Sequence, residues 1–323
     1  MNLSAPLIII DDQRFLLHDT GGCDHPEIPA RLQAIRQSLE RSDSLPDFSF
    51  VSPQPAAREH LLLAHDENWL FRFEESVLSG KTFIDHSDNQ IGYDSYEVAV
   101  LAAGAGITAV DLLEREEVST VFCLVRPPGH HAEHSFPFGF CFFNNCVLAA
   151  RYWQQEYSRK RILVFDFDAH HGNGIQSAFE EERDGFYISI HEHPSFSYPG
   201  TGYGEETGIG EGRGTVLNIP LSPGSDWKQL EHILTSVIPD RLEEWQPQAI
   251  LVAAGFDGHR EDDMSGLHYP TELYAEFGKA VRSWAATYTD GKTLSILEGG
   301  YELAVLGDSV ESYLRGLLGS EPG

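Results

Sequence analysis

The stretch RILVFDFDAHHGNG, from Arg161 to Gly174, decides the fold class of this 323-residue chain. Its first half is an apolar run of branched and aromatic residues, which predicts a buried strand over residues 161–167. The second half changes at once to carboxylates, imidazoles and glycines. A buried strand that runs directly into a polar turn is typical of an α/β protein, in which the ligand crevice lies outside the carboxyl ends of parallel strands.

The same alternation of short apolar runs and longer helical patterns extends over the whole chain. Further strands are expected at 5–10, 120–125, 185–191, 215–219, 249–254 and 293–297. Helices are expected at 28–41, 66–79, 94–114, 145–157, 227–245, 271–288 and 308–318, and a long glycine-rich loop at 199–214. Because no repeat, low-complexity tract or linker interrupts this pattern, we expect residues 1–323 to form a single α/β domain with a parallel sheet covered by helices.

Composition argues against several classes of function. The chain has 22 Lys and Arg against 50 Asp and Glu, a net charge of −28, which opposes nucleic-acid binding because phosphates need basic partners. The charge fits either solubility or the attraction of cationic substrates such as polyamines and lysine-rich tails. No apolar run approaches the roughly 20 residues of a membrane helix. The four cysteines form no CxxC pair, so a cytoplasmic protein with reduced thiols is expected.

Polar residues gather after four of the expected strands. They are His130 and His131 after 120–125, Asp166, Asp168, His170 and Asn173 in and after 161–167, Asp257 after 249–254, and Glu298 and Tyr301 after 293–297. Because the carboxyl ends of parallel strands meet at one edge of a sheet, we expect these side chains to converge on one pocket.

A metal site is one interpretation of these clusters. Asp168 and His170 are two residues apart at the end of an extended strand, so their side chains point the same way and could bind one ion. Asp257 from another strand end would complete a set of one nitrogen and two oxygens. Three protein ligands leave room for a water molecule, as a catalytic zinc site requires.

The paired histidines and the tyrosine are each open to two interpretations. His130 and His131 follow a Pro-Pro-Gly turn, where they could cap local backbone or perform acid–base chemistry beside a metal-bound water. For the second role they need partners that set tautomer and charge, and Asp166 and Asn173 are the candidates. Tyr301 could donate a hydrogen bond to a developing oxyanion, or it could be an ordinary half-buried tyrosine.

Six ordered motifs resemble one family. The segments RPPGHHA (126–132), GFCFFNN (139–145), FDFDAHHGNG (165–174), YPGTG (198–202), AAGFDGH (253–259) and EGGY (298–301) look like the histone deacetylase-like amidohydrolases. That family includes histone deacetylases, acetylpolyamine amidohydrolases and bacterial deacetylase-like enzymes. The resemblance extends in order from His25 to about residue 315 and therefore covers nearly the whole chain.

The resemblance implies a fold and a set of site residues. The fold would be a single α/β domain around an eight-stranded, mostly parallel sheet of the arginase and deacetylase type. The zinc ligands would be Asp168, His170 and Asp257, with Fe²⁺ also possible. The tandem histidines His130 and His131 would be backed by Asp166 and Asn173, and Tyr301 would polarise the carbonyl. Gly139 and Phe140 would line a tunnel for the acyl-lysine chain, facing Tyr198, and Asp94 would bind the substrate at the rim. A structural K⁺ would take oxygens from Asp166, Asp168, His170 and Ser189.

Two positions depart from the best-known members. Asn173 stands where class I enzymes carry a second aspartate, so His131 should be held less readily as imidazolium. Tyr198 stands where the tunnel commonly has a second phenylalanine, which adds a hydroxyl to one wall. That hydroxyl could favour a more polar acyl group or chain.

The expected activity is hydrolysis of an N-acetyl or related amide of a lysine side chain, a polyamine or a similar small amine. Two alternatives remain open at this point. One is an arginase-like hydrolase with two manganese ions, for which Asn173 and the Gly258–His259 sequence after Asp257 lack the additional carboxylates. The other is a non-catalytic acyl-lysine binder, although no ligand or tyrosine has been lost. The sequence does not decide between these substrates or fix an oligomeric state.

Overall fold

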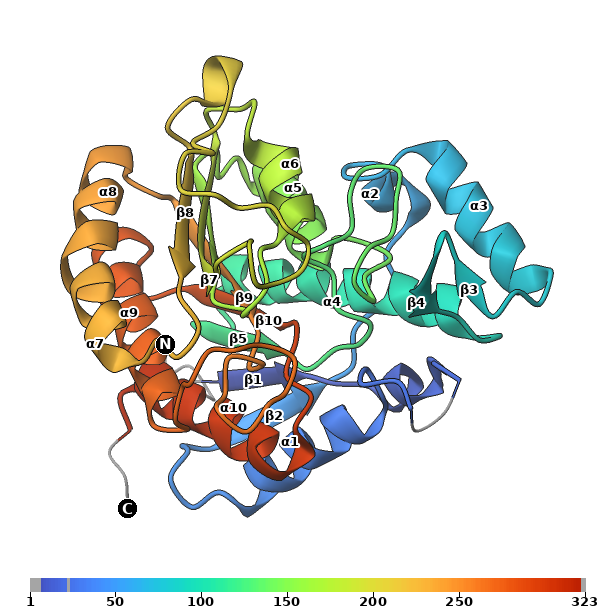
Figure 1. The fold of residues 1–323 in the computed structure, drawn as a ribbon, viewed down its shortest axis with the longest axis horizontal. Coiled ribbons are helices and arrows are strands. Elements are labelled where there is room, and N and C mark those ends of the chain that lie inside the picture. The colour runs from blue at the N-terminus through green and yellow to red at the C-terminus, as the bar shows by residue number, and fades with distance from the viewer. Residues whose placement is uncertain (1–6, 22–23, 321–323) are drawn as a thin grey trace.

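The computed structural model describes residues 7–21 and 24–320 and is built on one eight-stranded sheet. The strand order is β2-β1-β5-β10-β9-β6-β7-β8, and every neighbouring pair is parallel (Figure 1). The strands are β1 (Leu7–Ile10), β2 (Phe48–Val51), β5 (Thr120–Cys123), β6 (Ile162–Asp166), β7 (Gly185–Glu192), β8 (Val216–Leu221), β9 (Ala249–Ala254) and β10 (Thr293–Leu297). An α/β fold with a parallel sheet is therefore confirmed, and the sheet is wholly rather than mostly parallel.

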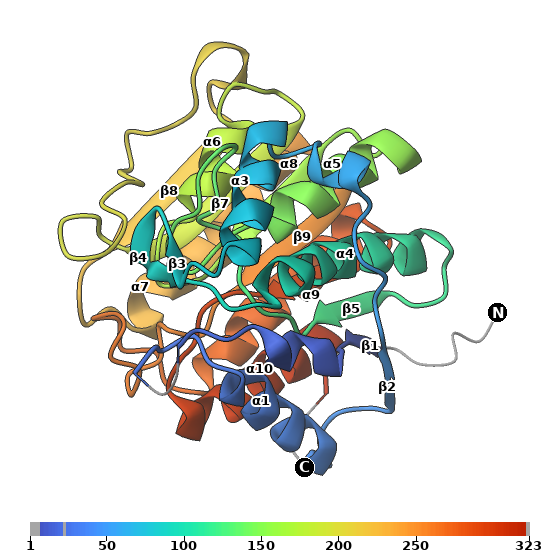
Figure 2. The same ribbon diagram turned by 90° about the vertical axis from the view of Figure 1, so that its right-hand side faces the viewer.

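Helices cover both faces of this sheet, as Figures 1 and 2 show. One face carries α4 (Ser95–Glu114), α5 (Asn145–Tyr157) and α6 (Asn173–Phe179), and the other carries α1 (Ala30–Arg41), α9 (Leu273–Tyr288) and α10 (Leu303–Leu318). With both faces covered, a strand must be apolar on both sides, and all five residues of β6 and all six of β9 are buried. This explains why the central strands are continuous apolar runs in the sequence.

Smaller elements complete the chain. They are the 3₁₀ turns η1 (Gln13–Leu17) and η2 (Gly210–Gly212), helices α2 (Arg58–Leu61), α3 (Glu67–Leu78), α7 (Trp227–His232) and α8 (Ile238–Trp245), the π turn η3 (Ile233–Val237), and the antiparallel hairpin β3 (Phe83–Ile84) and β4 (His86–Gln90). In Figure 1, α2, α3 and the hairpin lie together to one side of the sheet.

The expected strands all form within the described residues, although residues 5 and 6 lie outside them. The edge strand β2 and helix α6 are among the elements that the sequence pattern did not predict, together with α2 and the hairpin of β3 and β4. The edge strand β2 has only four residues and none is fully buried, so it has no clear apolar run. Helix α6 begins at Asn173 directly after the polar turn, where glycines obscure helical periodicity. Helix α10 starts at Leu303 instead of 308, and the helix expected over 227–245 is divided by the π turn η3.

Helix α4 is long and apolar enough to cross a membrane by length and composition alone, contrary to the expectation that no segment of the chain is. About two thirds of its most apolar window is buried inside the protein, as in the core helix of a globular domain. A Cβ on Gly104 would lie 1.9 Å from the Gln54 carbonyl oxygen, so α4 contacts neighbouring backbone directly. Cys123, Cys141 and Cys146 are buried free thiols, while Cys23 lies outside the described residues.

Candidate active site

The four polar strand ends converge at one edge of the sheet. Strands β5, β10, β9 and β6 are consecutive neighbours, so the residues that follow them are brought together. Asp168, His170 and Asp257 are buried, and each offers a ligand atom within 4.8 Å of the other two. The convergence expected from the sequence is therefore present in the structure.

These three residues form a cradle that fits a divalent cation. His170 Nδ1 lies 2.8 Å from Asp257 Oδ2 and 3.2 Å from Asp168 Oδ1. Asp168 accepts the backbone N–H of Gly299 (2.8 Å) and of His170 (2.9 Å), and Asp257 accepts the backbone N–H of Ala169 (2.9 Å). Two buried carboxylates side by side are costly without a compensating cation. Accordingly, burial and the charge of Asp168 raise the pKa of Asp257.

Glycine is required on two sides of the cradle. A Cβ on Gly255 would lie 2.0 Å from Asp168 Oδ2, and a Cβ on Gly299 would lie 2.4 Å from Asp257 Oδ2. Side chains at either position would displace a carboxylate. These contacts explain the glycines that follow β9 and β10 in the sequence.

The orientation of His170 is set from its far side. Its Nε2 lies 3.1 Å from the carbonyl oxygen of Met264, which can only accept a hydrogen bond. Nε2 therefore carries the hydrogen, and Nδ1 faces the two carboxylates. Although burial opposes protonation, Asp257 and Asp168 raise the pKa of His170 well above its usual value. A cation held by these groups would replace that proton.

The paired histidines lie beside the cradle with different partners. Their ring centroids are 3.9 Å apart. His130 Nδ1 lies 3.1 Å from Asp166 Oδ2, and His131 Nδ1 lies 2.8 Å from Asn173 Oδ1. Burial disfavours the charged form of His130, but Asp168 and Asp166 raise its pKa to about 10. Burial and the charges of His130 and His170 lower the pKa of His131 well below its usual value.

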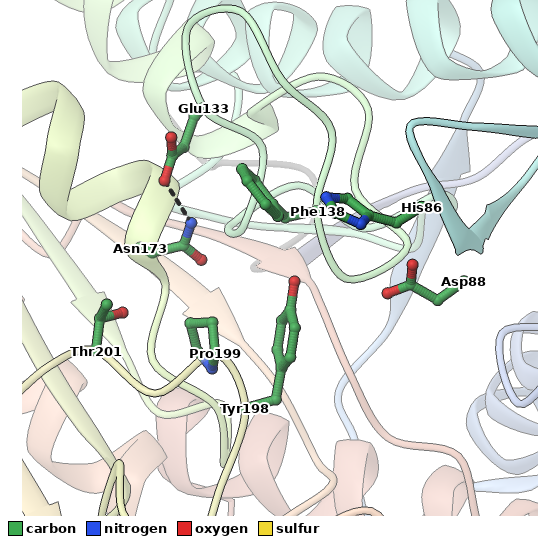
Figure 3. A pocket seen from close by; sticks show the side chains of 8 residues that line it. All are labelled: His86, Asp88, Glu133, Phe138, Asn173, Tyr198, Pro199 and Thr201. Atoms are coloured by element: carbon green, nitrogen blue, oxygen red, sulfur yellow. Dashed lines mark hydrogen bonds between the residues drawn. The ribbon is translucent and has the colours of Figure 1, made fainter.

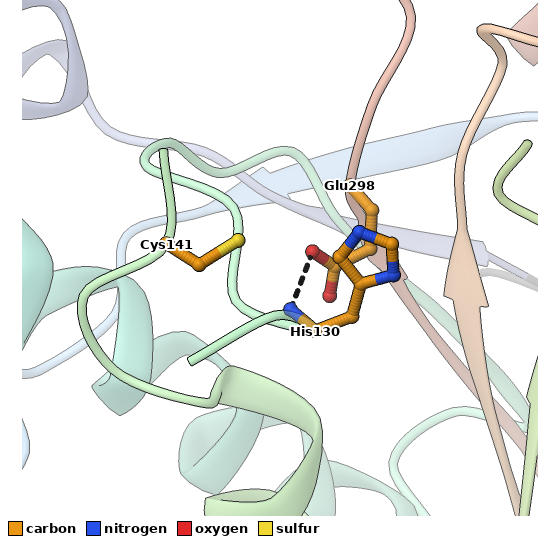
Figure 4. A group of neighbouring side chains, drawn as sticks. All are labelled: His130, Cys141 and Glu298. Atoms are coloured by element: carbon orange, nitrogen blue, oxygen red, sulfur yellow. Dashed lines mark hydrogen bonds between the residues drawn. The ribbon is translucent and has the colours of Figure 1, made fainter. Parts of the chain in front are cut away.

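A buried carboxylate, Glu298, holds the turn that carries these histidines. Its Oε2 accepts the backbone N–H of Gly129 (2.6 Å) and of His130 (3.0 Å), and Figure 4 shows the second of these bonds. Cys146 Sγ donates to its other oxygen at 3.5 Å. Burial raises the pKa of Glu298 to about 7. No role was predicted for Glu298, although a carboxylate directly after a buried strand indicates a buried charge that needs partners.

Further unpredicted partners surround Asp166 and Asn173. The Tyr187 hydroxyl donates to Asp166 Oδ2 at 2.9 Å and accepts the backbone N–H of Gly172 at 2.9 Å. The amide of Asn173 donates to Glu133 Oε1 at 2.8 Å. Tyr187 lies within a buried strand and resembles an ordinary core residue in the sequence, so no pattern could have identified it.

Tyr301 lies close to the cradle and to the wall predicted for the tunnel. Its ring meets the ring of Phe140 edge to face with centroids 5.9 Å apart, and the Arg31 guanidinium lies 4.8 Å from its centroid. Its hydroxyl makes no hydrogen bond within residues 7–21 and 24–320. Burial raises the pKa of Tyr301 well above its usual value, so the hydroxyl stays protonated and able to donate.

The predicted tunnel residues lie together next to His131. Gly139 has a positive φ of 51°, and a Cβ there would lie 2.4 Å from His131 Cδ2 and 3.0 Å from Tyr198 Cε1. Tyr198 meets the His131 ring edge to face at 5.0 Å. Glycine at 139 thus lets Tyr198 and His131 approach each other closely.

A pocket of about 300 Å³ lies beside Tyr198 and Asn173, and Figure 3 shows the side chains that line it. It is lined by His86, Asp88, Glu133, Phe138, Asn173, Tyr198, Pro199 and Thr201. Two carboxylates, Asp88 and Glu133, are therefore among the side chains that line this pocket, which we call the mouth of the site. Asp94, predicted for the rim, instead precedes α4 as its N-cap residue and is not among the lining residues. Its role in substrate binding stays a prediction.

The residues predicted to bind potassium are also neighbours. Ser189 pairs in register with Asp166 across β6 and β7, and its hydroxyl lies 2.7 Å from His191 Nδ1. The Asp168 backbone N–H donates to Asp166 Oδ1 at 3.1 Å. This arrangement brings the named oxygen donors to one strand end, and potassium binding itself stays a prediction.

Comparison with known proteins agrees with this arrangement. The family model described as histone deacetylase domain matches residues 25–317. The chain is 38% identical over 315 residues to a probable deacetylase of Methanothermobacter thermautotrophicus, covering 98% of this chain and 92% of that protein. It is 35% identical over 338 residues to a polyamine deacetylase of Danio rerio, covering 98% of this chain and 48% of that protein. The crystal structure of the HDA15 HD domain matches with a TM-score of 0.91 at 30% identity, covering 99% of this chain and 90% of that one.

Proposed function

The chain belongs to the histone deacetylase family, and from this premise we propose that it hydrolyses the N-acetyl or a related amide of a lysine side chain, polyamine or similar small amine. Asp168, His170 and Asp257 would hold one divalent cation, zinc or iron(II). The observation that carries the proposal is the buried cradle of these three ligands, with its atoms within 4.8 Å of one another beside two histidines and a tyrosine. Such a cation supplies a Lewis acid that polarises the acyl carbonyl and lowers the pKa of water.

His131 is the general base in this proposal. Its Nδ1–H donates to Asn173 Oδ1, so Nε2 is left with a free lone pair. Because its pKa is lowered, the imidazole is neutral at physiological pH and able to accept a proton from water. Asn173 is uncharged and therefore does not stabilise the imidazolium as an aspartate would.

His130 complements His131 in charge. The carboxylates of Asp166 and Asp168 favour its protonated form, so it supplies positive charge next to the reacting carbonyl. One of the two histidines then protonates the departing amine, and their rings are close enough to act on the same substrate. Tyr301 donates its hydroxyl hydrogen to the carbonyl oxygen as that oxygen gains negative charge.

The carboxylates at the mouth of the site would attract a cationic substrate. Asp88 and Glu133 line the outer pocket, and the chain as a whole carries a net charge of −28. A linear amine with a further positive charge would lay its acyl end along Gly139, Phe140 and Tyr198 while its charged part lies among these carboxylates. The similarity to a protein named as a polyamine deacetylase supports a polyamine substrate. Acetylated lysines of peptides remain the alternative substrate class.

A structural potassium ion belongs to the same proposal. Asp166, Asp168, His170 and Ser189 would supply its oxygens at the end of β6. Its function would be to screen the buried carboxylates that orient His130.

The test is metal-dependent turnover. The purified protein is stripped with a chelator, reconstituted with zinc or iron(II), and assayed on acetylated polyamines and acetyl-lysine peptides. We expect activity to return at about one metal per chain. Two metals per chain in the active form would favour a binuclear hydrolase, and binding of acetyl-lysine without turnover would favour a non-catalytic binder; either result would refute the proposal.

A further inference from the structure

Asp262 is a buried carboxylate outside the set of ligands and catalytic groups described above. It lies in the loop between β9 and α9, and only 5% of the residue is exposed. Its Oδ2 accepts the backbone N–H of Tyr301 at 2.6 Å and of Glu302 at 3.0 Å. Its Oδ1 accepts the backbone N–H of Met264 at 3.1 Å. Three backbone donors from two loops therefore converge on one side chain.

The two loops that Asp262 joins each carry part of the active site. On one side, Met264 uses its carbonyl oxygen to accept the Nε2–H of His170, a ligand of the cradle. On the other side, the Tyr301 backbone is held directly, next to Gly300 with a φ of 116°. Glycine allows that conformation but does not restrict the chain to it. The direction of the Tyr301 side chain therefore depends on contacts to its backbone.

We propose that Asp262 is a positioning residue that fixes the Tyr301 hydroxyl relative to the metal ligand His170. This inference rests on the proposed function, because it assigns Asp262 a role through Tyr301. Arg31 donates from Nε to the Gly300 carbonyl oxygen at 2.6 Å, so the segment is held from its carbonyl side as well. Asp262 supplies the contacts on the N–H side, and through Met264 it links them to the loop that orients His170.

A carboxylate is needed here because every group that meets Asp262 in these contacts is a donor. Asparagine has nearly the same volume but offers one acceptor oxygen and one NH₂ donor. In Asp262→Asn, one of the two loops must face a donor with its own N–H, so the link between the loops is lost. The exposed neighbour Asp263 provides a matched control, since Asp263→Asn makes the same chemical change one residue away.

The experiment is a double-mutant cycle on the metal-loaded protein. Asp262→Asn and Asp263→Asn are each made in the wild type and in Tyr301→Phe, and kcat, KM, metal content and melting temperature are measured. Misplacing a positioned group by about 1 Å can cost on the order of 100-fold. We expect Asp262→Asn to lower kcat about 10- to 100-fold with KM and metal content nearly unchanged. In Tyr301→Phe it should lower kcat less than about threefold, because the hydroxyl it positions is already gone.

The outcomes separate this inference from the proposed function. Equal losses from Asp262→Asn in both backgrounds, or a kcat within about threefold of wild type, would overturn the positioning role alone. Normal turnover of Tyr301→Phe would overturn the positioning role together with the role of Tyr301, whereas the proposed function itself falls only if the metal-loaded wild type does not hydrolyse acyl amines. If Asp262→Asn does not fold, Asp262→Glu replaces it, because it keeps the charge and shifts the acceptor by one methylene. The same dependence on Tyr301 is then required of that variant.

Discussion

Replacing Tyr301 by phenylalanine tests the mechanism with the smallest structural change. The substitution removes one hydroxyl, which makes no hydrogen bond within the described residues, and keeps the ring that contacts Phe140 and Arg31. We therefore expect folding and metal content to be retained, with a melting temperature within about 2 °C of wild type. The lost interaction is the hydrogen bond to the developing oxyanion. One such donor is worth about 10²–10³ in kcat, or roughly 3–4 kcal/mol.

The loss should fall on kcat rather than KM, because the bond strengthens as the carbonyl oxygen gains charge. Burial raises the pKa of Tyr301, so the hydroxyl donates over the whole assay range and the loss should not depend on pH. The assay is steady-state release of free amine, with metal content and melting temperature from the same preparation. Tyr203→Phe is the control, since it removes a hydroxyl from a tyrosine that is 40% exposed and does not line the pocket. Turnover of Tyr301→Phe within about threefold of wild type would refute the reasoning.

Three further predictions concern the metal, the mouth and stability. Asp257→Asn should lose both the metal and nearly all activity, and elemental analysis that finds one metal per chain would contradict this. Asp88→Asn should lower kcat/KM for acetylated polyamines at low salt but not for a neutral acyl amine, whereas an equal effect on both would remove Asp88 from charge recognition. Burial lowers the pKa of His65 to about 4, so its contribution to stability is fully present above about pH 6.5 and is lost as pH falls toward 4. The stability advantage of wild type over His65→Asn in urea unfolding should shrink by up to about 3 kcal/mol over that window, and a constant difference would contradict the buried neutral state.

The sequence predicts best the strands that are buried on both faces of the sheet. Strands β6 and β9 are continuous apolar runs because helices cover each side of the sheet, and this alone distinguishes them from loops. The edge strand β2 pairs only with β1 and remains partly exposed, so its four residues lack that signal. Helix α6 starts within the polar turn that carries the site, where chemistry rather than periodicity determines the residues.

The candidate site divides in a similar way. Asp168, His170 and Asp257 can be predicted from the sequence, because carboxylates and imidazoles directly after apolar strands are unusual. Contacts made by backbone groups, such as the Met264 carbonyl and the Gly129 N–H, cannot be predicted in this way, because almost every residue carries the same two groups. Their importance comes only from which atoms the fold brings beside them. Asp262 could not be predicted either, because its partners are all backbone N–H groups and the chain has many other acidic residues.

The hydrogen-bond partners around His131 determine its tautomer, which the sequence alone does not. Sequence places Asn173 behind the histidine but leaves the direction of the amide open. In the structure the Asn173 NH₂ group donates to Glu133 Oε1 and lies 3.3 Å from the His131 carbonyl oxygen, both of which can only accept. The amide oxygen must therefore face His131 Nδ1, which lies 2.8 Å away and must carry the hydrogen. Glu133 thus sets the tautomer of His131 through an uncharged amide, and Nε2 keeps the lone pair that a general base requires without a second carboxylate in direct contact.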